Sequence, residues 1–263
     1  MAQLIGDFLF TGSLEALSAY KMRGSDKIIL RTKGGPSRQM IKNSPRFDIT
    51  RRNNMEFGGR ATAARKVKRI LQPLQFLADY NFTGPLNALL KPIQAMDTTS
   101  EFGQRNVLLS QNPRLLEGFT LNRRFLFDTI VRNPIAYTLS KELLQATIDI
   151  PALMPNLNFV APGNFQWYRF IGVMGIVPDL FYTPNGYTPM GQTEEFCSEI
   201  NEENWLPVNS ASAPVTISLQ VNDKPKTSSY SCMLAIGIAF GTMIEGRIEP
   251  VKYIGGAKIV GLR

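Results

Sequence analysis

Length, charge and residue usage exclude several classes of protein before any motif is considered. The chain has 263 residues, of which 44% are hydrophobic and 19% charged, fractions that are typical of a globular rather than a disordered protein. It contains two cysteines and no histidine, so it lacks a disulfide framework, the usual general base of Ser and Cys hydrolases and the usual transition-metal ligand. We therefore expect a protein without enzyme activity and without a cofactor, made in a reducing compartment.

No leader and no membrane span is predicted. The apolar triplet Phe8-Leu9-Phe10 is too short for the core of a signal peptide. The longest nearly apolar run, Met233 to Ile244, falls short of the roughly 18 residues that a spanning helix needs. We expect a protein that is cytoplasmic at synthesis, or part of an assembled particle, with no cleaved signal peptide.

The net charge of +8 is unevenly distributed along the chain. Residues 1–70 carry 15 Lys/Arg and 5 Asp/Glu, a balance of 15 − 5 = +10, whereas the remainder carries 14 and 16, a balance of 14 − 16 = −2. Such asymmetry is typical of proteins that contact nucleic acid. It is equally expected where a basic segment of one subunit meets an acidic face of another.

The first part of the chain has the pattern of a small β-meander. Strands are predicted over residues 3–10, 13–22 and 27–33, with a tight turn at 23–26. A meander of this size buries little by itself, so it must dock either on the rest of the chain or on a neighbouring subunit. The glycines that follow, Gly34-Gly35, lack the Gly-Lys-Ser/Thr ending of a phosphate loop and indicate a turn.

Helical signals follow. Ser44 before Pro45 predicts a helix start, Gly58-Gly59 is expected to separate a first short helix from a second, and Pro73 predicts a kink or a fresh start. Gly84-Pro85 opens a further helix, with apolar residues at helical spacing from Leu86 to Met96. The core face of the longer helix is expected to comprise Ala63, Val67, Ile70, Leu71, Leu74 and Ala78.

The pattern changes towards the carboxyl end. Residues 97–111 are expected to form a surface loop, Asn112-Pro113 opens a helical turn, and residues 121–131 stay unassigned between strand and helix. From about Leu144 the apolar residues alternate, which predicts half-buried antiparallel strands arranged as a β-sandwich. The predicted class is α+β, with a basic meander and helical region at 1–143 and a β-sandwich domain at 144–263.

Two charged groups are the candidate contact residues. The basic side of the helical region, together with Arg60, suits partner or phosphate contacts, although aromatic residues that could stack on single-stranded bases are missing from it. The second group is acidic, runs from Glu194 to Glu203, and is a candidate counter-surface for the basic residues in a stretch that is expected to form one or two helical turns. This stretch lacks the Asp/Asn and Gly spacing of a calcium loop. The basic residues are Arg51, Arg52, Arg65, Lys66, Lys68 and Arg69, and the acidic residues are Glu194, Glu195, Glu199, Glu202 and Glu203.

Several local patterns carry a resemblance. They are Gly12, Ser18 to Lys21, Arg31 to Gly35, Thr50 to Gly58, Ile148 to Pro151 and Trp167 to Phe170. With these patterns the chain resembles a family of uncharacterised bacterial proteins common in Bacteroidetes-type genomes. The resemblance implies a bacterial origin and a basic first half joined to a β-rich second half, and it implies no activity.

The sequence favours a structural subunit that associates with copies of itself into a filament, tube or shell. In this hypothesis the amino-terminal segment reaches a neighbour, and the basic helix face meets an acidic rim. The first alternative is a nucleic-acid-binding protein that uses the same basic face. The second alternative is a carbohydrate- or ligand-binding β-sandwich, which would need a concave aromatic patch near Trp167. A hydrolase that works through paired carboxylates needs no histidine, but no pair of Asp/Glu residues is placed around a shared cleft by the sequence.

Overall fold

The computed structural model describes residues 2–4, 10–22, 26–190, 198–222, 225 and 227–263. The chain has an α+β fold and divides into two compact units, residues 1–51 and 52–263. Residues 52–143 and 144–263, which the sequence pattern assigns to separate domains, therefore lie in one unit. Among the helices of the described residues, none has both the length and the apolar character needed to cross a membrane.

The first unit contains a four-stranded antiparallel sheet in the order β1-β4-β3-β2. Its strands are β1 (Ala2–Leu4), β2 (Gly12–Leu14), β3 (Leu17–Lys21) and β4 (Ile28–Thr32). The prediction of one strand over residues 13–22 was wrong, because the backbone turns at Glu15, where φ is +44°, and forms the β2–β3 hairpin. Two short helical segments follow, α1 (Arg38–Asn43) and η1 (Pro45–Phe47).

A single long helix, α2 (Asp48–Ile70), replaces the two helices that the sequence predicts on either side of Gly58-Gly59. Gly59 is buried against the ring of Tyr187, and a Cβ at this position would lie 2.6 Å from Tyr187 Cε1. The glycine therefore permits close packing and does not end the helix. The fresh start expected at Pro73 is confirmed, since η2 (Gln72–Leu77) begins one residue before it.

The remaining helical segments are α3 (Thr83–Ala95), η3 (Leu109–Gln111), η4 (Pro113–Leu116) and α4 (Phe127–Ile130). The predicted apolar face of α2 and η2 is confirmed, because all six of its residues are buried. In α3, Leu86, Leu90 and Ile93 are buried, whereas Met96 beyond its end is exposed. The expected surface loop at residues 97–111 is wrong in part, because Val107 and Leu109 are fully buried.

The strands of the second unit form two main sheets. The larger has the order β10-β7-β13-β14, with β11 also paired to β7, and the smaller has the order β12-β6-β5. A further hairpin joins β8 (Leu180–Thr183) to β9 (Gly186–Pro189). The remaining strands are β5 (Ala136–Ser140), β6 (Gln145–Ile150), β7 (Trp167–Pro178), β10 (Ser198–Glu202), β11 (Leu206–Pro207), β12 (Val215–Gln220), β13 (Tyr230–Ile244) and β14 (Arg247–Leu262).

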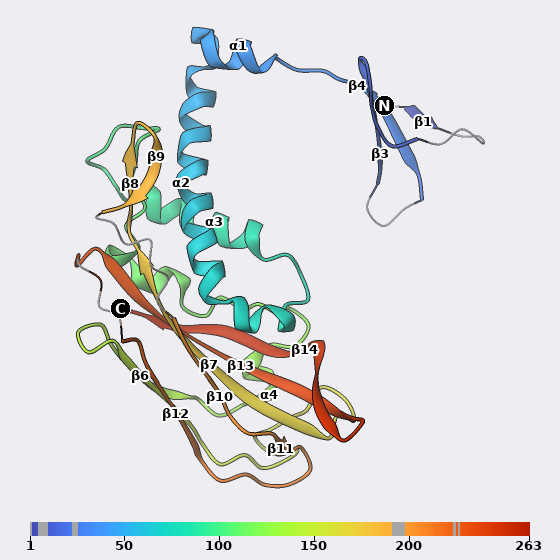
Figure 1. The fold of residues 1–263 in the computed structure, drawn as a ribbon, viewed down its shortest axis with the longest axis vertical. Helices are drawn as coiled ribbons and strands as arrows, with labels where there is room; N and C mark the ends of the chain where they lie inside the picture. The colour runs from blue at the N-terminus through green and yellow to red at the C-terminus, as the bar shows by residue number, and fades with distance from the viewer. Residues whose placement is uncertain (1, 5–9, 23–25, 191–197, 223–224, 226) are drawn as a thin grey trace. The chain divides into compact units, whose positions relative to one another are not determined.

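The larger sheet is covered on both faces. Figure 1 shows α2 and α3 on one side of β7, β13 and β14, and β6 and β12 on the other. A Cβ on Gly175 would meet Ile70 at 2.7 Å, and a Cβ on Gly172 of the same strand would meet Ile217 of β12 at 2.7 Å. The prediction that β7 is half-buried was therefore wrong, because both of its faces are covered. The alternating burial of β6 and β12 follows the predicted pattern.

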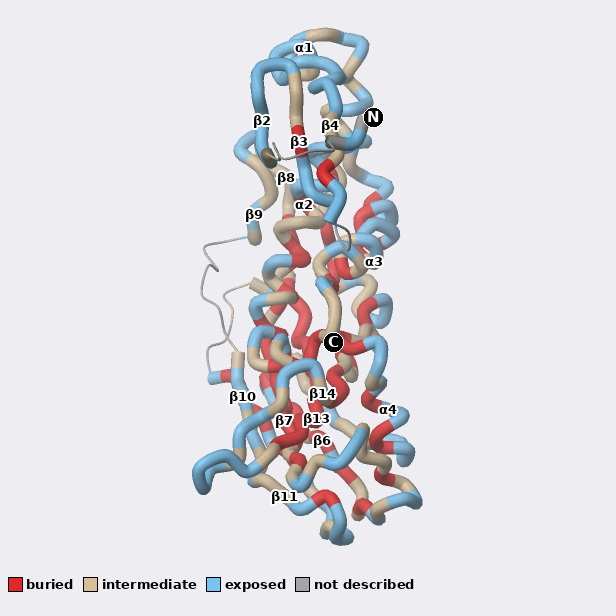
Figure 2. The backbone as a smooth tube through the Cα atoms, turned by 90° about the vertical axis from the view of Figure 1, so that its right-hand side faces the viewer, coloured by how far each residue is buried: buried red, intermediate tan, exposed pale blue. Residues whose placement is uncertain are grey.

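Two hydrophobic cores result from this layering, one between the helices and the larger sheet and one between the two sheets. Buried residues concentrate along β7, β13 and β14 and along the part of α2 that faces them (Figure 2). Neither core includes a residue before Ala63 among the residues that the structure describes.

Candidate functional site

The predicted cation Arg51 holds the backbone at the start of α2. Its Nη1 donates to the carbonyl oxygens of Ile41 and Ser44, each at 2.8 Å, and its Nη2 donates to Asp48 Oδ1 at 3.3 Å. The last carbonyl groups of a short helix have no intrahelical partner, so the guanidinium supplies a donor to the Ile41 carbonyl and a second donor to the Ser44 carbonyl, which also accepts from the Phe47 N–H at 3.1 Å. Arg51 is thus committed to the local structure.

The other predicted cations fall into two places along α2. Arg52 donates to the carbonyl of Phe102 at 3.4 Å, while Lys68 donates to Thr83 Oγ1 at 3.1 Å. Arg65 and Lys66 make no hydrogen bond or ion pair with any residue in the described ranges. Because a helix rises by about 1.5 Å per residue, Arg52 lies roughly 20 Å from Arg65 along the axis. The predicted basic cluster is therefore split, and its continuous part runs from Arg65 to Arg69.

The buried ionic group in the middle of α2 is Glu56, a residue that does not belong to either predicted charged group. Its side chain is buried, and its two carboxylate oxygens accept from Arg105 Nε at 2.6 Å and Arg105 Nη2 at 2.8 Å. The backbone N–H of Gly103 donates to the same carboxylate at 3.0 Å, and Arg60 lies 3.8 Å from it. Bidentate pairing of an arginine with a carboxylate is among the strongest kinds of hydrogen bonding in proteins.

The charge state of this group follows from its neighbours. Burial alone would raise the pKa of Glu56, but the hydrogen bonds from Arg105 and Gly103 and the positive charges of Arg105 and Arg60 together lower the pKa below its usual range. Burial and the charge of Glu56 raise the pKa of Tyr187 to about 12. Glu56 is therefore ionised and Tyr187 is neutral near neutral pH.

Hydrogen bonds extend this cluster to α3 and to the β8–β9 hairpin. Gln94 is buried, accepts from Arg60 at 2.8 Å, and donates to the Arg105 carbonyl at 2.8 Å and to the Tyr187 hydroxyl at 3.2 Å. The Tyr187 hydroxyl in turn donates to the Arg105 carbonyl at 3.0 Å. Four segments are thus fixed by one network, which sets the positions of the side chains beside it.

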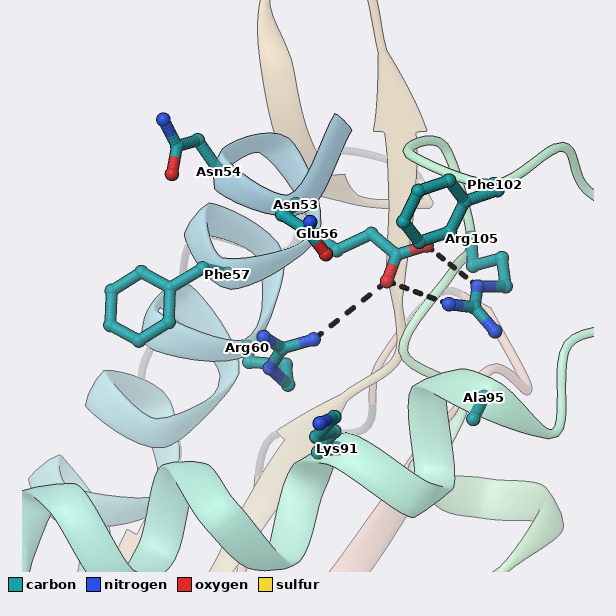
Figure 3. A pocket seen from close by; sticks show the side chains of 9 residues that line it. All are labelled: Asn53, Asn54, Glu56, Phe57, Arg60, Lys91, Ala95, Phe102 and Arg105. Carbon is teal, nitrogen blue, oxygen red and sulfur yellow. Dashed lines mark hydrogen bonds and ion pairs between the residues drawn. The ribbon is translucent and has the colours of Figure 1, made fainter. Parts of the chain in front are cut away.

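A hollow of about 510 Å³ adjoins this network. Figure 3 shows Glu56 at its centre, with Arg105 and Phe102 on one side, Arg60 and Lys91 below, and Phe57 at the outer rim. The guanidinium of Arg60 lies 5.9 Å from the centre of the Phe57 ring, and that of Arg105 lies 5.3 Å from the centre of the Phe102 ring. The complete lining is Asn53, Asn54, Glu56, Phe57, Arg60, Lys91, Ala95, Phe102 and Arg105.

The predicted acidic counter-surface is only partly described. Glu194 and Glu195 lie outside the described residues, and the helical turns expected near them are replaced, from Ser198 onward, by strand β10. Glu202 pairs with Arg169 at 2.6 Å, and the backbone N–H of Glu203 donates to the carbonyl of Phe170 at 3.0 Å. Glu199 is exposed on β10, which is an edge strand. The described glutamates therefore differ in how much charge they can offer a partner.

The sheet of the first unit has one apolar face. In its antiparallel register, Leu14 is opposite Leu17 and Ala19 is opposite Leu30, and residues two apart on a strand share a face. Leu14, Leu17, Ala19, Ile28 and Leu30 consequently lie on the same side. Ala19 and Ile28 are buried, Leu17 and Leu30 are partly buried, and Leu14 is 59% exposed.

A second hollow, of about 520 Å³, lies at the end of the sandwich. It is adjacent in sequence to Trp167, where a concave aromatic patch would be expected, but its aromatic lining is Phe159 and Phe165, and Trp167 does not line it. No charged side chain lines this hollow within the described part of the chain. Its lining is Pro155, Asn156, Phe159, Val160, Ala161, Gly163, Asn164, Phe165, Gln166, Val208 and Asn209.

Sequence reasoning missed the Glu56 cluster for an identifiable reason. Glu56 and Arg105 are 49 residues apart, and no spacing rule connects them. One signal was present, because Glu56 is the only acidic residue between Ile49 and Ile70 and lies on the side of the helix that carries Gly59 and Ala63. A lone carboxylate at such a position predicts a buried partner.

Comparisons with protein-family models, with curated proteins and with solved structures found no match to the chain. The resemblance to a Bacteroidetes-type family therefore stays a prediction. Function has to be argued from the surfaces and hollows described above. Within the described ranges, no three acidic, cysteine or histidine side chains gather as a metal site would require.

Proposed function

We propose that the chain is a non-enzymatic structural subunit that associates with copies of itself into a larger homo-oligomeric assembly such as a filament, tube or shell. The observation that carries this proposal is the apolar face of the amino-terminal sheet, formed by Leu14, Leu17, Ala19, Ile28 and Leu30. No described residue of this face belongs to either hydrophobic core, and Leu14 is more than half exposed.

A sheet with one apolar face is stable only when that face is covered. Full burial of a leucine side chain contributes about 1.5–3 kcal/mol, so covering Leu14 and completing the burial of Leu17 and Leu30 would contribute several kcal/mol. This gain is available only when another surface packs on the sheet. The proposed role of the first unit is to supply that contact.

Charge favours a second copy of the chain as the partner. Residues 1–51 carry 9 Lys/Arg and 4 Asp/Glu, a balance of 9 − 4 = +5, whereas residues 71–263 carry 14 and 16, a balance of 14 − 16 = −2. The second unit as a whole, residues 52–263, carries 20 Lys/Arg and 17 Asp/Glu, a balance of 20 − 17 = +3, so the basic first unit is complementary only to the acidic parts of another copy. On that copy, edge strand β10 presents the exposed Glu199 beside Ile200, which is also exposed. Contacts of this head-to-tail type generate open assemblies when the rotation between subunits does not close a ring.

The test is the mass of the purified full chain, measured by light scattering and by negative-stain microscopy at low and high salt. We expect regular particles or multiples of the 29.4 kDa chain mass that survive nuclease treatment. The variant Leu14→Glu should shift the protein to a monomer, because a carboxylate cannot be buried in an apolar contact.

Leu143→Glu is the matched control, since Leu143 is 66% exposed and lies outside the first unit, and its mass should equal that of the unchanged protein. A monomer under every condition would refute the proposal. Particles that dissolve only with nuclease would instead place nucleic-acid binding first. The sites to change in that case are Arg65 and Lys66, and replacing either cation by alanine should make binding less dependent on salt, because fewer phosphates are then neutralised.

The hollow near Trp167 favours a second candidate function, the binding of a neutral carbohydrate. Asn156, Asn164, Gln166 and Asn209 supply amide donors and acceptors, and Phe165 supplies an aromatic surface, while charged groups are missing from the described lining. Titration with neutral oligosaccharides should give saturable binding that Asn164→Ala weakens and that Asn54→Ala, in the other hollow, leaves unchanged. Binding that is equal in both variants, or not saturable, would exclude this function.

A further inference from the structure

We infer that the hollow between α2 and α3 binds a small ligand that carries one oxyanion group, a carboxylate or a phosphate, on a flat apolar body. The inference goes beyond self-association and rests on different residues. Its basis is the combination of uncompensated positive charge, exposed phenyl rings and a volume of about 510 Å³. This volume lies within the range of roughly 300–1,000 Å³ that is typical of small-molecule sites.

The charge of the hollow is positive once its internal ion pair is counted. Arg60, Lys91 and Arg105 supply three positive charges and Glu56 one negative charge, so the balance is 3 − 1 = +2. Both carboxylate oxygens of Glu56 accept from Arg105, and Arg60 shares the same carboxylate at 3.8 Å, so one negative charge faces two guanidinium groups and Lys91 has no anionic partner among the described residues. An incoming oxyanion would supply that partner.

Hydrogen-bond donors remain for such a ligand. Arg60 uses Nη1 to donate to Gln94 and is placed 3.8 Å from Glu56, so its other N–H groups are available. Lys91 is exposed and makes no hydrogen bond or ion pair with any residue that the structure describes. Figure 3 shows the two side chains next to each other on one side of the hollow. Together they form a convergent pair of cationic donors on two rigid helices.

Two phenyl rings bound the same space. Phe57 is 55% exposed and Phe102 is 40% exposed, although each is stacked near a guanidinium group. A flat apolar body that packs against the exposed part of these rings would cover surface that now contacts water. The amide groups of Asn53 and Asn54 provide neutral polar contacts at the edge. This lining suits a small aromatic acid or an aryl phosphate.

A nucleic-acid backbone fits this hollow less well. Such backbones are bound by many Lys/Arg contacts spread along a surface, and here two cations face a single hollow. The continuous basic strip from Arg65 to Arg69 lies at least one helical turn further along α2. Binding at the hollow and binding at the strip can therefore be separated by mutation.

The experiment is calorimetric titration of the full chain with phenyl phosphate, benzoate and inorganic phosphate. We expect saturable one-to-one binding of phenyl phosphate or benzoate, with inorganic phosphate weaker by about tenfold because it lacks the apolar body. Comparison of phenyl phosphate with benzoate distinguishes the two oxyanions. Lys91→Ala should weaken binding by about tenfold or more, whereas Phe57→Ala should weaken phenyl phosphate and leave inorganic phosphate unchanged.

Lys252→Ala is the matched control, because Lys252 is also an exposed lysine without a partner among the described residues and lies far along the chain in β14. It should bind like the unchanged protein. The inference would be overturned if neither aromatic anion saturates by about 10 mM. It would equally be overturned if Lys91→Ala and Lys252→Ala lose the same affinity, since that result would indicate general attraction by net charge. Neither outcome bears on the mass measurement that tests self-association.

Discussion

Replacement of Glu56 by alanine is the sharpest test of how the second unit is held together. The substitution removes the acceptor of three hydrogen bonds, two from the Arg105 side chain and one from the Gly103 backbone. Gly103 is buried, so its unpaired N–H costs about 1–3 kcal/mol. The Arg105 side chain is 23% exposed and regains some hydration, which keeps the total near the lower end of the 3–5 kcal/mol typical of broken buried pairs.

We therefore expect Glu56→Ala to lower the free energy of unfolding by about 3 kcal/mol. Equilibrium unfolding in urea, followed by tryptophan fluorescence, measures this change. With a slope of about 2 kcal/mol per molar urea, the midpoint should fall by about 1.5 M. Glu142→Ala, which removes an exposed carboxylate, should stay within about 0.5 kcal/mol of the unchanged protein.

The double variant Glu56→Ala with Arg105→Ala completes the test. Because it leaves no guanidinium without its acceptor, it should be more stable than the sum of the two single effects by about 1–2 kcal/mol. Strict additivity would refute the argument that the pair acts as a unit. A loss below about 1 kcal/mol in Glu56→Ala alone would show that the pair is hydrated in solution.

Three further predictions concern neighbouring features. Gly58→Ala should raise the free energy of unfolding by about 0.5–1 kcal/mol, because the added Cβ would meet nothing within 4 Å. Gly59→Ala should lower the free energy of unfolding by about 1–3 kcal/mol, because the added Cβ would overlap the ring of Tyr187. Effects of the same sign in urea unfolding would contradict this packing. Burial alone would raise the pKa of Asp97, but hydrogen bonds from the backbone N–H groups of Asn106 and Ser100 and from the Thr99 hydroxyl lower it below the ordinary 3.8, and the pKa of Glu56 likewise lies below 4.5. Stability should therefore be complete above about pH 5 and should fall as the pH drops through the folded-state pKa values. A flat profile of the urea midpoint down to about pH 3 would exclude this linkage. Burial raises the pKa of the Cys232 thiol to about 11. At about pH 8 a thiol reagent should therefore modify Cys232 no faster than the protein unfolds locally around it. Rapid labelling of this residue in the native protein, detected by peptide mass, would contradict the burial.

Patterns that depend on neighbours in the sequence predicted their elements well. The helical face from Ala63 to Ala78 and the start of α3 near Gly84-Pro85 were confirmed, because a helix places every third or fourth residue on one side wherever it packs. Strands β6 and β12 were predicted equally well from their alternating sequence, since one face of each strand is buried and the other contacts water. The α+β class follows from these two periodicities alone.

Other features were decided only when segments met in space. Strand β7 does not show the expected alternation, because helices cover one of its faces and the smaller sheet covers the other. Gly58-Gly59 did not break the helix, because Tyr187, more than 120 residues later, packs on the second glycine. The loop at residues 97–111 became partly internal because Glu56 and Asp97 bind its backbone N–H groups.

The candidate sites show the same division. Composition and charge by themselves determined that the first 70 residues are strongly basic and that histidine chemistry is impossible. Which cations are committed and which face solvent was decided by the tertiary structure, which ties Arg51 to nearby carbonyls and leaves Lys91 beside Arg60 at the hollow. The physical reason is that a periodic pattern records how one segment divides between core and water, whereas an ion pair or a hollow depends on where distant segments come to lie.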